Sequence, residues 1–138
     1  ASYNTAVGFT ALAANTTGLQ NVAIGSEALF SSTTADNNTA VGKSALQANT
    51  TGINNAAFGS GSLFVATTGS NNTAIGNNAL SDNTTGSDNI AIGYNSMRGN
   101  VVTGSHNTCV GDASGNEITS GANNTFIGKD VIKEITSY

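Results

Sequence analysis

The sequence has 138 residues, a formal net charge of −4 and only 9% charged residues, with no proline and no tryptophan. This length suits one domain spanning residues 1–138. Its four cations are too few for the basic patch that a nucleic-acid-binding protein needs. No apolar run approaches the roughly 20 residues of a membrane-spanning helix. Valine, isoleucine and leucine recur at fixed offsets, which argues against a disordered chain.

The dominant feature is an asparagine followed four residues later by a glycine, a pair that occurs eight times. Successive glycines of these pairs are 17 residues apart, except for one step of 18 residues between Gly93 and Gly111. A fixed period over the whole chain predicts stacked copies of one small unit. The units start at residues 4, 21, 38, 55, 72, 89, 107 and 124. Positions are counted below from the asparagine, which is position 1, so that the glycine is position 5.

Each unit contains two apolar stretches, first Asn-x-Ala-(Val/Ile)-Gly and then (Ala/Ser)-Leu. Helices are not expected, because glycine, asparagine and threonine dominate the unit and all three are poor helix formers. Two strands of about four or five residues, joined by two turns, fit one unit at roughly 3.3 Å per residue. The sequence therefore predicts an all-β fold, a parallel β-solenoid of about eight coils.

Two columns of large apolar residues are predicted to face the interior. Position 4 holds Val7, Ile24, Val41, Phe58, Ile75, Ile92, Val110 and Ile127, and position 9 holds Leu12, Leu29, Leu46, Leu63, Leu80, Met97, Gly115 and Ile132. Position 3 is alanine in six units, namely Ala6, Ala23, Ala40, Ala57, Ala74 and Ala91. Because side chains alternate along a strand, we expect the alanines on the outer face. Close packing of that face against identical chains would make the protein a homo-oligomer.

The asparagines at position 1 are predicted to form a structural ladder in which each side-chain amide bonds the amides above and below it. They are Asn4, Asn21, Asn38, Asn55, Asn72, Asn89, Asn107 and Asn124. The glycines at position 5 are expected to supply backbone angles that other residues avoid.

The seventh and eighth units depart from the pattern. Cys109 takes the place of the position 3 alanine and is the sole cysteine, so no disulfide can form within the chain, and we expect a small buried side chain. In the last unit Phe126 replaces the alanine and Val131 precedes Ile132 where other units have Ala-Leu. Because an open solenoid end exposes unpaired backbone, residues 124–138 are predicted to form a cap or a transition to another segment.

The core of the unit, seen as Asn-Val-Ala-Ile-Gly at 21–25 and Asn-Thr-Ala-Ile-Gly at 72–76, resembles the head repeats of YadA-type trimeric autotransporter adhesins. The serine or alanine three residues past the glycine matches that motif, at Ala11, Ala28, Ala45, Ser62, Ala79, Ser96 and Ser114. The adhesin repeat is shorter, and the present unit adds a Thr-Thr-Gly turn. The longer unit, as in residues 77–93, is similar to repeats of phage-type tail fibres.

These resemblances imply a left-handed β-roll that assembles as a homotrimer in a surface or virion fibre. The expected function is structural and adhesive, attachment to a host cell or surface through a glycan or protein receptor. The expected location is extracellular, on a virion tail fibre or a bacterial surface, and the motif leaves both open. No membrane insertion of this segment and no nucleic-acid partner are expected.

No arrangement of residues predicts catalysis, a cofactor or a metal site. His106 is the only histidine, and it lies in the turn of the 18-residue unit. The eight carboxylates share no position that would pair a general acid with a general base. We therefore predict that the protein is not an enzyme.

The position 13 threonines are the strongest candidates for surface contacts. They are Thr16, Thr33, Thr50, Thr67 and Thr84. A threonine ladder on a solenoid could bind ice or carbohydrate, which is the alternative function, although the following glycine indicates ordinary turn chemistry. A receptor could instead contact variable side chains such as Phe9, Glu27, Lys43, Asn77, Tyr94 and Lys129.

Overall fold

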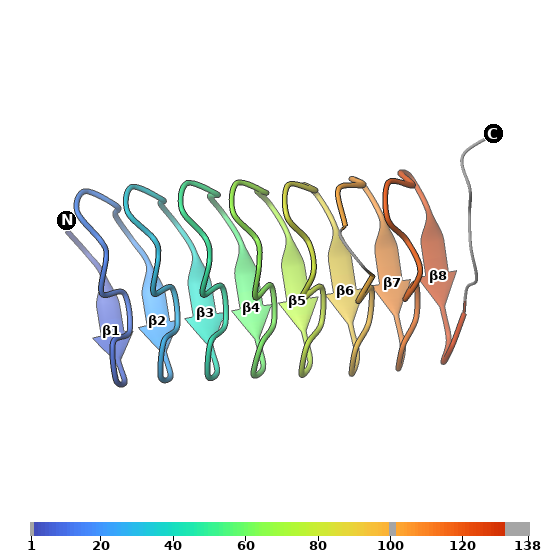
Figure 1. Ribbon diagram of the computed structural model, residues 1–138, viewed down its shortest axis with the longest axis horizontal. Coiled ribbons are helices and arrows are strands. Elements are labelled where there is room, and N and C mark those ends of the chain that lie inside the picture. Colours follow the sequence, from blue (N-terminus) through green and yellow to red (C-terminus); the bar gives the residue numbers. More distant parts are fainter. Residues whose placement is uncertain (1, 100–101, 132–138) are drawn as a thin grey trace.

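The protein is a parallel β-solenoid, as predicted, and its eight strands are joined by about seven turns of the chain (Figure 1). The computed structural model describes residues 2–99 and 102–131. It contains eight three-residue strands: β1 (Thr5–Val7), β2 (Val22–Ile24), β3 (Thr39–Val41), β4 (Ala56–Phe58), β5 (Thr73–Ile75), β6 (Ile90–Ile92), β7 (Thr108–Val110) and β8 (Thr125–Ile127). They form one sheet in sequence order, and each strand pairs with the next in register, as in Ala23↔Ala40↔Ala57. The described residues form no helix, and hence none that could cross a membrane.

Each coil contains one strand, whereas the sequence had predicted two. The backbone leaves the extended region at positions 7 and 9, where Glu27 has a φ of 62° and Leu29 a φ of 51°. The same left-handed angles recur in the other coils, at residues such as Leu46 and Leu63. Residues other than glycine rarely adopt positive φ. The leucines in the sequence therefore gave no indication of this backbone conformation. Because positions 7 and 9 have left-handed backbone angles, the expected second strand is instead a run of turns. We call positions 6 to 12 the loop side.

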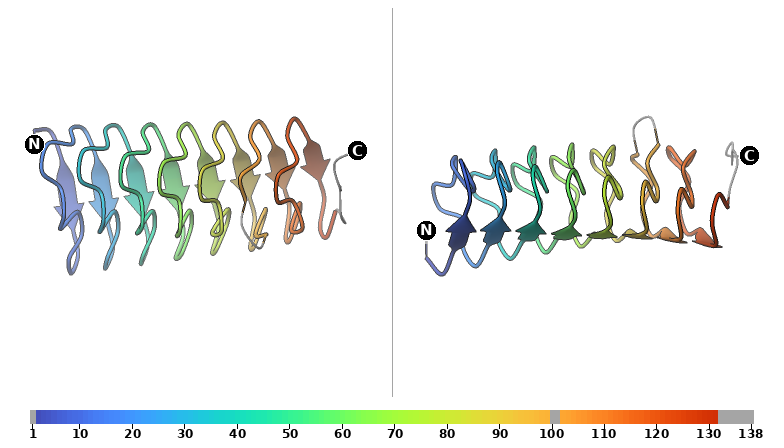
Figure 2. Two further views of the ribbon diagram at one scale, coloured as in Figure 1. Left: turned by 45° about the horizontal axis from the view of Figure 1, so that its top comes forward. Right: turned by 90° about the horizontal axis from the view of Figure 1, so that it is seen from below.

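Backbone hydrogen bonds between coils continue on the loop side. The N–H of Glu27 donates to the carbonyl of Phe9 in the preceding coil (2.9 Å), and the N–H of Leu29 donates to Ala45 in the following coil (3.0 Å). Ser31 then donates to Gln47 (2.9 Å). Backbone hydrogen bonds therefore join the loop side to both neighbouring coils without a second sheet. The loop side lies opposite the strands (Figure 2).

The strands face the opposite way from the prediction. Ala23, Ala40, Ala57, Ala74 and Ala91 at position 3 are fully buried inside their own chain. The position 4 residues point outward instead, and Ile24 is 39% and Ile75 42% exposed. The reason is the width of the coil: the position 9 leucines from Leu29 to Leu80, which are buried as predicted, enter from the loop side and leave room for only a methyl group on the strand. Leu12 in the first coil is partly buried, and Ile132 lies outside the described residues. The alanine column is thus core and cannot be a subunit interface.

The interior changes composition near the C-terminal end but stays filled. Gly115 stands where other coils have leucine, and a Cβ there would collide with the Cys109 sulfur and lie 3.2 Å from Ile118 Cδ1. The larger Cys109, Ile118 and the half-buried Phe126 therefore occupy the volume that leucine fills elsewhere. Burial removes the Cys109 thiol from water and raises its pKa to about 11, so the sulfur stays protonated at neutral pH.

The stack continues into the eighth unit. Strand β8 pairs with β7, and the N–H of Gly115 donates to the carbonyl of Val131 (2.8 Å). The extra residue of the 18-residue unit falls between Met97 and Val102, because Thr84 donates to Val102 one residue later than the equivalent bond in other coils. Within the predicted cap at 124–138, residues 124–131 continue the stack through β8, and residues 132–138 lie outside the described residues.

Candidate functional site

The asparagine ladder lies in the interior and serves the backbone. Asn38 Oδ1 accepts a hydrogen bond from the backbone N–H of Asn55 in the next coil (2.9 Å), and Asn38 Nδ2 donates to the carbonyl of Gly52 in its own coil (2.9 Å). The same two bonds recur along the column. The expected amide-to-amide bonds form in part of it, where the Nδ2 atoms of Asn72, Asn107 and Asn124 also donate to Oδ1 of the preceding ladder asparagine at 3.1, 3.2 and 3.0 Å. At Asn72 and Asn107 the bond from Nδ2 to the position 15 carbonyl, at 2.9 and 2.8 Å, is shorter than the bond to the neighbouring amide. The ladder is therefore structural, and no ligand reaches it.

A second asparagine supports the same corner and was missed from the sequence. Asn49 and Asn83 at position 12 are fully buried, and each donates to the position 15 carbonyl of its own coil, at 3.0 and 2.9 Å. The carbonyl of Gly52 thus accepts from both Asn38 and Asn49. Position 12 also holds serine, alanine and isoleucine, and this variation hid its role in the sequence.

The threonine ladder also bonds within the chain. The position 13 hydroxyls donate to the carbonyl of the equivalent residue one coil further on, and Thr50 reaches Thr67 and Thr67 reaches Thr84 at 3.0 Å. Longer bonds of 3.4 Å join Thr33 to Thr50 and Thr84 to Val102. These hydroxyl protons are occupied, which fits turn chemistry better than an array presented to water.

The titratable residues do not converge on a reaction centre in the described part of the chain. His106 Nδ1 lies 4.0 Å from Asp88 Oδ2, and both side chains are exposed. Lys129 Nζ lies 3.6 Å from Asp112 Oδ2 on another coil pair. Within residues 2–99 and 102–131, no three His, Cys, Asp or Glu side chains lie close enough to hold a metal ion.

The outward surface of the strands, here called the sheet face, consists of positions 2 and 4 of all eight coils. Its residues are Thr5, Val7, Val22, Ile24, Thr39, Val41, Ala56, Phe58, Thr73, Ile75, Ile90, Ile92, Thr108, Val110, Thr125 and Ile127. None of them is charged, and large side chains such as Phe58 (41% exposed) and Ile75 (42%) lie open along its length. The strands form one continuous row in Figure 2, so this apolar face runs from end to end of the solenoid.

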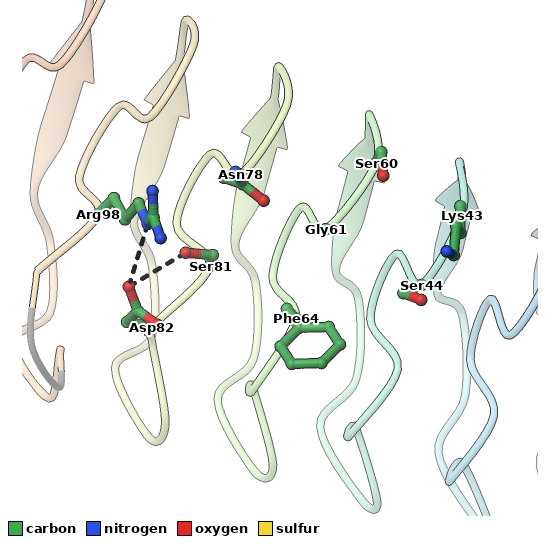
Figure 3. Close-up of a pocket in the computed structure, with 9 residues that line it drawn as sticks. All are labelled: Lys43, Ser44, Ser60, Gly61, Phe64, Asn78, Ser81, Asp82 and Arg98. Atoms are coloured by element: carbon green, nitrogen blue, oxygen red, sulfur yellow. Dashed lines mark hydrogen bonds and ion pairs between the residues drawn. The ribbon is translucent and has the colours of Figure 1, made fainter.

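A groove with a volume of about 380 Å³ crosses four coils on the loop side (Figure 3). It is lined by Lys43, Ser44, Ser60, Gly61, Phe64, Asn78, Ser81, Asp82 and Arg98. Arg98 Nε lies 3.7 Å from Asp82 Oδ2, which also accepts a hydrogen bond from Ser81 Oγ (3.1 Å). Phe64, one of the lining residues, is 38% exposed. We call these nine residues the loop-side groove.

The structure separates the variable residues that the sequence had proposed as receptor contacts. Phe9 and Tyr94 are strongly exposed but lie outside the groove, whereas Lys43 lines it. Glu27 is half-buried and accepts hydrogen bonds from Ser44 Oγ (3.1 Å) and Gln47 Nε2 (2.8 Å). The other groove residues were not singled out from the sequence. The one available signal was Gly61, a glycine at a position where other units carry a side chain.

The chain matches no protein-family model, no curated protein and no solved structure. The likeness to adhesin and tail-fibre repeats therefore rests on the repeated motif alone. What the chain itself displays is the coarser feature, a β-roll of stacked units about 17 residues apart.

Proposed function

We propose that the protein is a segment of a homotrimeric fibre, exposed on a virion or a bacterial surface, that attaches to a host cell or another surface. The observation that carries this proposal is the uncharged, apolar sheet face. Monomeric soluble proteins rarely expose contiguous apolar patches of more than a few hundred Å². A strip of valine, isoleucine and phenylalanine along eight coils is therefore typical of a surface that another molecule covers.

A second copy of the chain is the partner best suited to this face. Each coil presents the same pair of positions at the same spacing, so identical solenoids can match coil for coil along their whole length. Closed symmetry around an axis parallel to the solenoid would bury every sheet face at once. The copy number of three rests on the resemblance to trimeric fibre repeats, and the interface differs from the alanine column predicted from the sequence.

In such a trimer the loop sides point outward on all three chains. Repeated loop-side surfaces on a rigid rod can attach to a receptor-bearing surface through many weak contacts, whose avidity exceeds each single affinity. No catalytic role is proposed, and extracellular location follows from the fibre assignment.

Sedimentation velocity tests the assembly. We expect the wild-type chain to sediment as a species of three times the 13.7 kDa monomer mass at micromolar concentration. Ile75→Lys puts a charge into the centre of the sheet face and should yield monomers. The matched control is Asn77→Lys, two residues further along the same coil and exposed outside the sheet face, which should leave the trimer intact.

Three results would count against the proposal. A wild-type monomer would refute self-association, and a stable dimer would refute the copy number. Equal effects of Ile75→Lys and Asn77→Lys would remove the sheet face from the interface. Thermal hysteresis by a wild-type monomer would instead support the ice-binding alternative.

A further inference from the structure

The loop-side groove exists because one coil departs from its neighbours. At position 7 the other coils carry side chains such as Glu27, Ser44 and Asn78, all at positive φ. Coil four has Gly61 there, with a φ of 68°. The missing side chain leaves a depression beside Phe64, and the Asn78 side chain leans over the glycine, since a Cβ at Gly61 would lie 2.5 Å from Asn78 Oδ1. Close approach of this kind needs glycine or a shift of the asparagine.

The charge of the groove is opposite to that of the protein. Lys43 and Arg98 are two of the three cations in residues 2–99 and 102–131, and both line it. Asp82 is its one carboxylate, so the lining carries a net charge of +1, whereas the chain carries −4. The two cations come from the third and sixth coils, three coil steps apart, or about 14 Å along the axis at ~4.8 Å per step. A ligand spanning the groove would meet a positive charge at each end.

Several polar side chains in the groove have no partner within the described protein. Lys43, Ser60 and Asn78 make no side-chain hydrogen bond or ion pair, although their backbones are bonded between coils. Phe64 lies among them with its ring partly in solvent (Figure 3). Hydroxyl, amide and cationic groups around an exposed aromatic ring combine apolar contact with directional hydrogen bonding.

We propose that the loop-side groove binds an acidic saccharide, an inference that rests on the attachment function proposed above and names its ligand class. The C–H face of one sugar ring packs on Phe64. Ring hydroxyls exchange hydrogen bonds with Ser60 and Asn78, and the carboxylates pair with Lys43 and Arg98 as charge-assisted hydrogen bonds.

An acidic peptide fits the groove less well than a saccharide. A peptide usually gains affinity by adding a strand to an open sheet edge. The loop-side amides around the groove already donate between coils, as in Gly61 to Lys43 (2.9 Å) and Asn78 to Ser60 (3.0 Å). The available groups are side chains, which suit a ligand rich in hydroxyls.

The test is an NMR titration of the full chain with 3′-sialyllactose and with trigalacturonate, each compared with neutral lactose. We expect millimolar dissociation constants for at least one acidic sugar. Neutral lactose should bind at least about tenfold more weakly, a difference of about 1.4 kcal/mol in binding free energy. Phe64→Ala and Lys43→Gln should each weaken acidic-sugar binding several-fold.

The repeat offers matched controls for both substitutions. Phe30 occupies the same position as Phe64, two coils earlier, with 40% against 38% exposure, and it does not line the groove. Lys129 occupies the same position as Lys43. Phe30→Ala and Lys129→Gln should bind the acidic sugar as the wild type does. Gly61→Glu should abolish binding by filling the groove with a carboxylate, and its backbone is tolerable because Glu27 has a φ of 62°.

The outcomes separate this inference from the proposed fibre. Failure of both acidic sugars to bind, equal binding of lactose, or equal losses in the matched controls would overturn the groove assignment. Binding of a polyglutamate peptide as tightly as the sugars would overturn the saccharide class. Sedimentation of the same samples reports the trimer independently, so a trimer without sugar binding refutes only the groove, and a sugar-binding monomer refutes only the assembly.

Discussion

The sheet face and the loop side are opposite surfaces of the same unit, and they tolerate different variation. On the sheet face, position 4 is valine, isoleucine or phenylalanine in all eight coils. On the loop side, position 10 changes from Phe30 to Gln47, Phe64, Ser81 and Arg98 in successive coils. A surface that meets copies of itself along its whole length needs the same residue in each coil. A surface that meets solvent or a receptor can change from coil to coil, and one such change opened the groove at Gly61.

Substitution of Gly59 and Gly61, two of the three glycines of coil four, should show the difference between the two surfaces most strongly. Gly59 follows the strand with a φ of 132°, and a Cβ there would lie 2.6 Å from the backbone carbon of Gly76. Gly59→Ala should therefore abolish cooperative folding, because the backbone of the next coil cannot yield. Gly61→Ala meets a movable side chain at an angle that other residues adopt, and should remain folded. Thermal unfolding followed by circular dichroism measures the effect of each variant. Similar melting temperatures for Gly59→Ala and Gly61→Ala would contradict this prediction.

Loss of one ladder asparagine should have the next largest effect. Asn72→Ala leaves the buried N–H of Asn89 without its acceptor at 3.0 Å, and it leaves the Gly86 carbonyl with Asn83 as its remaining side-chain donor. The unsatisfied N–H should lower the free energy of unfolding by about 1–3 kcal/mol. Asn77→Ala, on the exposed loop side, should change that free energy by less than about 0.5 kcal/mol. Urea unfolding at one fixed protein concentration measures both changes, because the proposed assembly would make stability depend on concentration.

Two neighbouring alanines of β4 test which strand face is core. Ala57 is fully buried and Ala56 faces outward. Ala57→Leu overfills the interior and should lower the free energy of unfolding by about 1–3 kcal/mol. Ala56→Leu enlarges the sheet face and should leave the unfolding of the monomer nearly unchanged. The comparison is made in the Ile75→Lys background, which is expected to be monomeric. If Ala56→Leu lowered the free energy of unfolding more than Ala57→Leu there, the outward face of β4 would be the core, as the sequence had predicted.

The threonine ladder should give the smallest effect. Thr67→Val removes a hydroxyl that donates to the Thr84 carbonyl at 3.0 Å and should cost about 0.5–1.5 kcal/mol. Thr68 is exposed, and its hydroxyl has no hydrogen-bond partner among the described residues, so Thr68→Val serves as the control. If Thr68→Val lowered the free energy of unfolding in urea more than Thr67→Val, position 13 would not stabilise the stack through its hydrogen bond between coils.

The period and the identity of its residues were enough to predict a parallel solenoid, because only stacking satisfies a 17-residue repeat of short apolar stretches. They were also enough to place Leu29, Leu46 and Leu63 inside, since a large apolar residue recurs at position 9 in successive coils. The groove was beyond prediction from sequence. Its residues are spread over 56 positions from Lys43 to Arg98 and come together only because successive coils stack.

The sequence by itself determined the repeat, the stack and the residue columns, because each follows from spacing along the chain. Tertiary structure alone decided which strand face is inside. Alternation separates Ala57 from Phe58 but does not say which one turns inward, and hydrophobicity favours the larger residue. The left-handed turns at positions 7 and 9 bring a leucine across the thin coil, and the space that remains admits only alanine. The same geometry leaves the valine, isoleucine and phenylalanine column outside the chain.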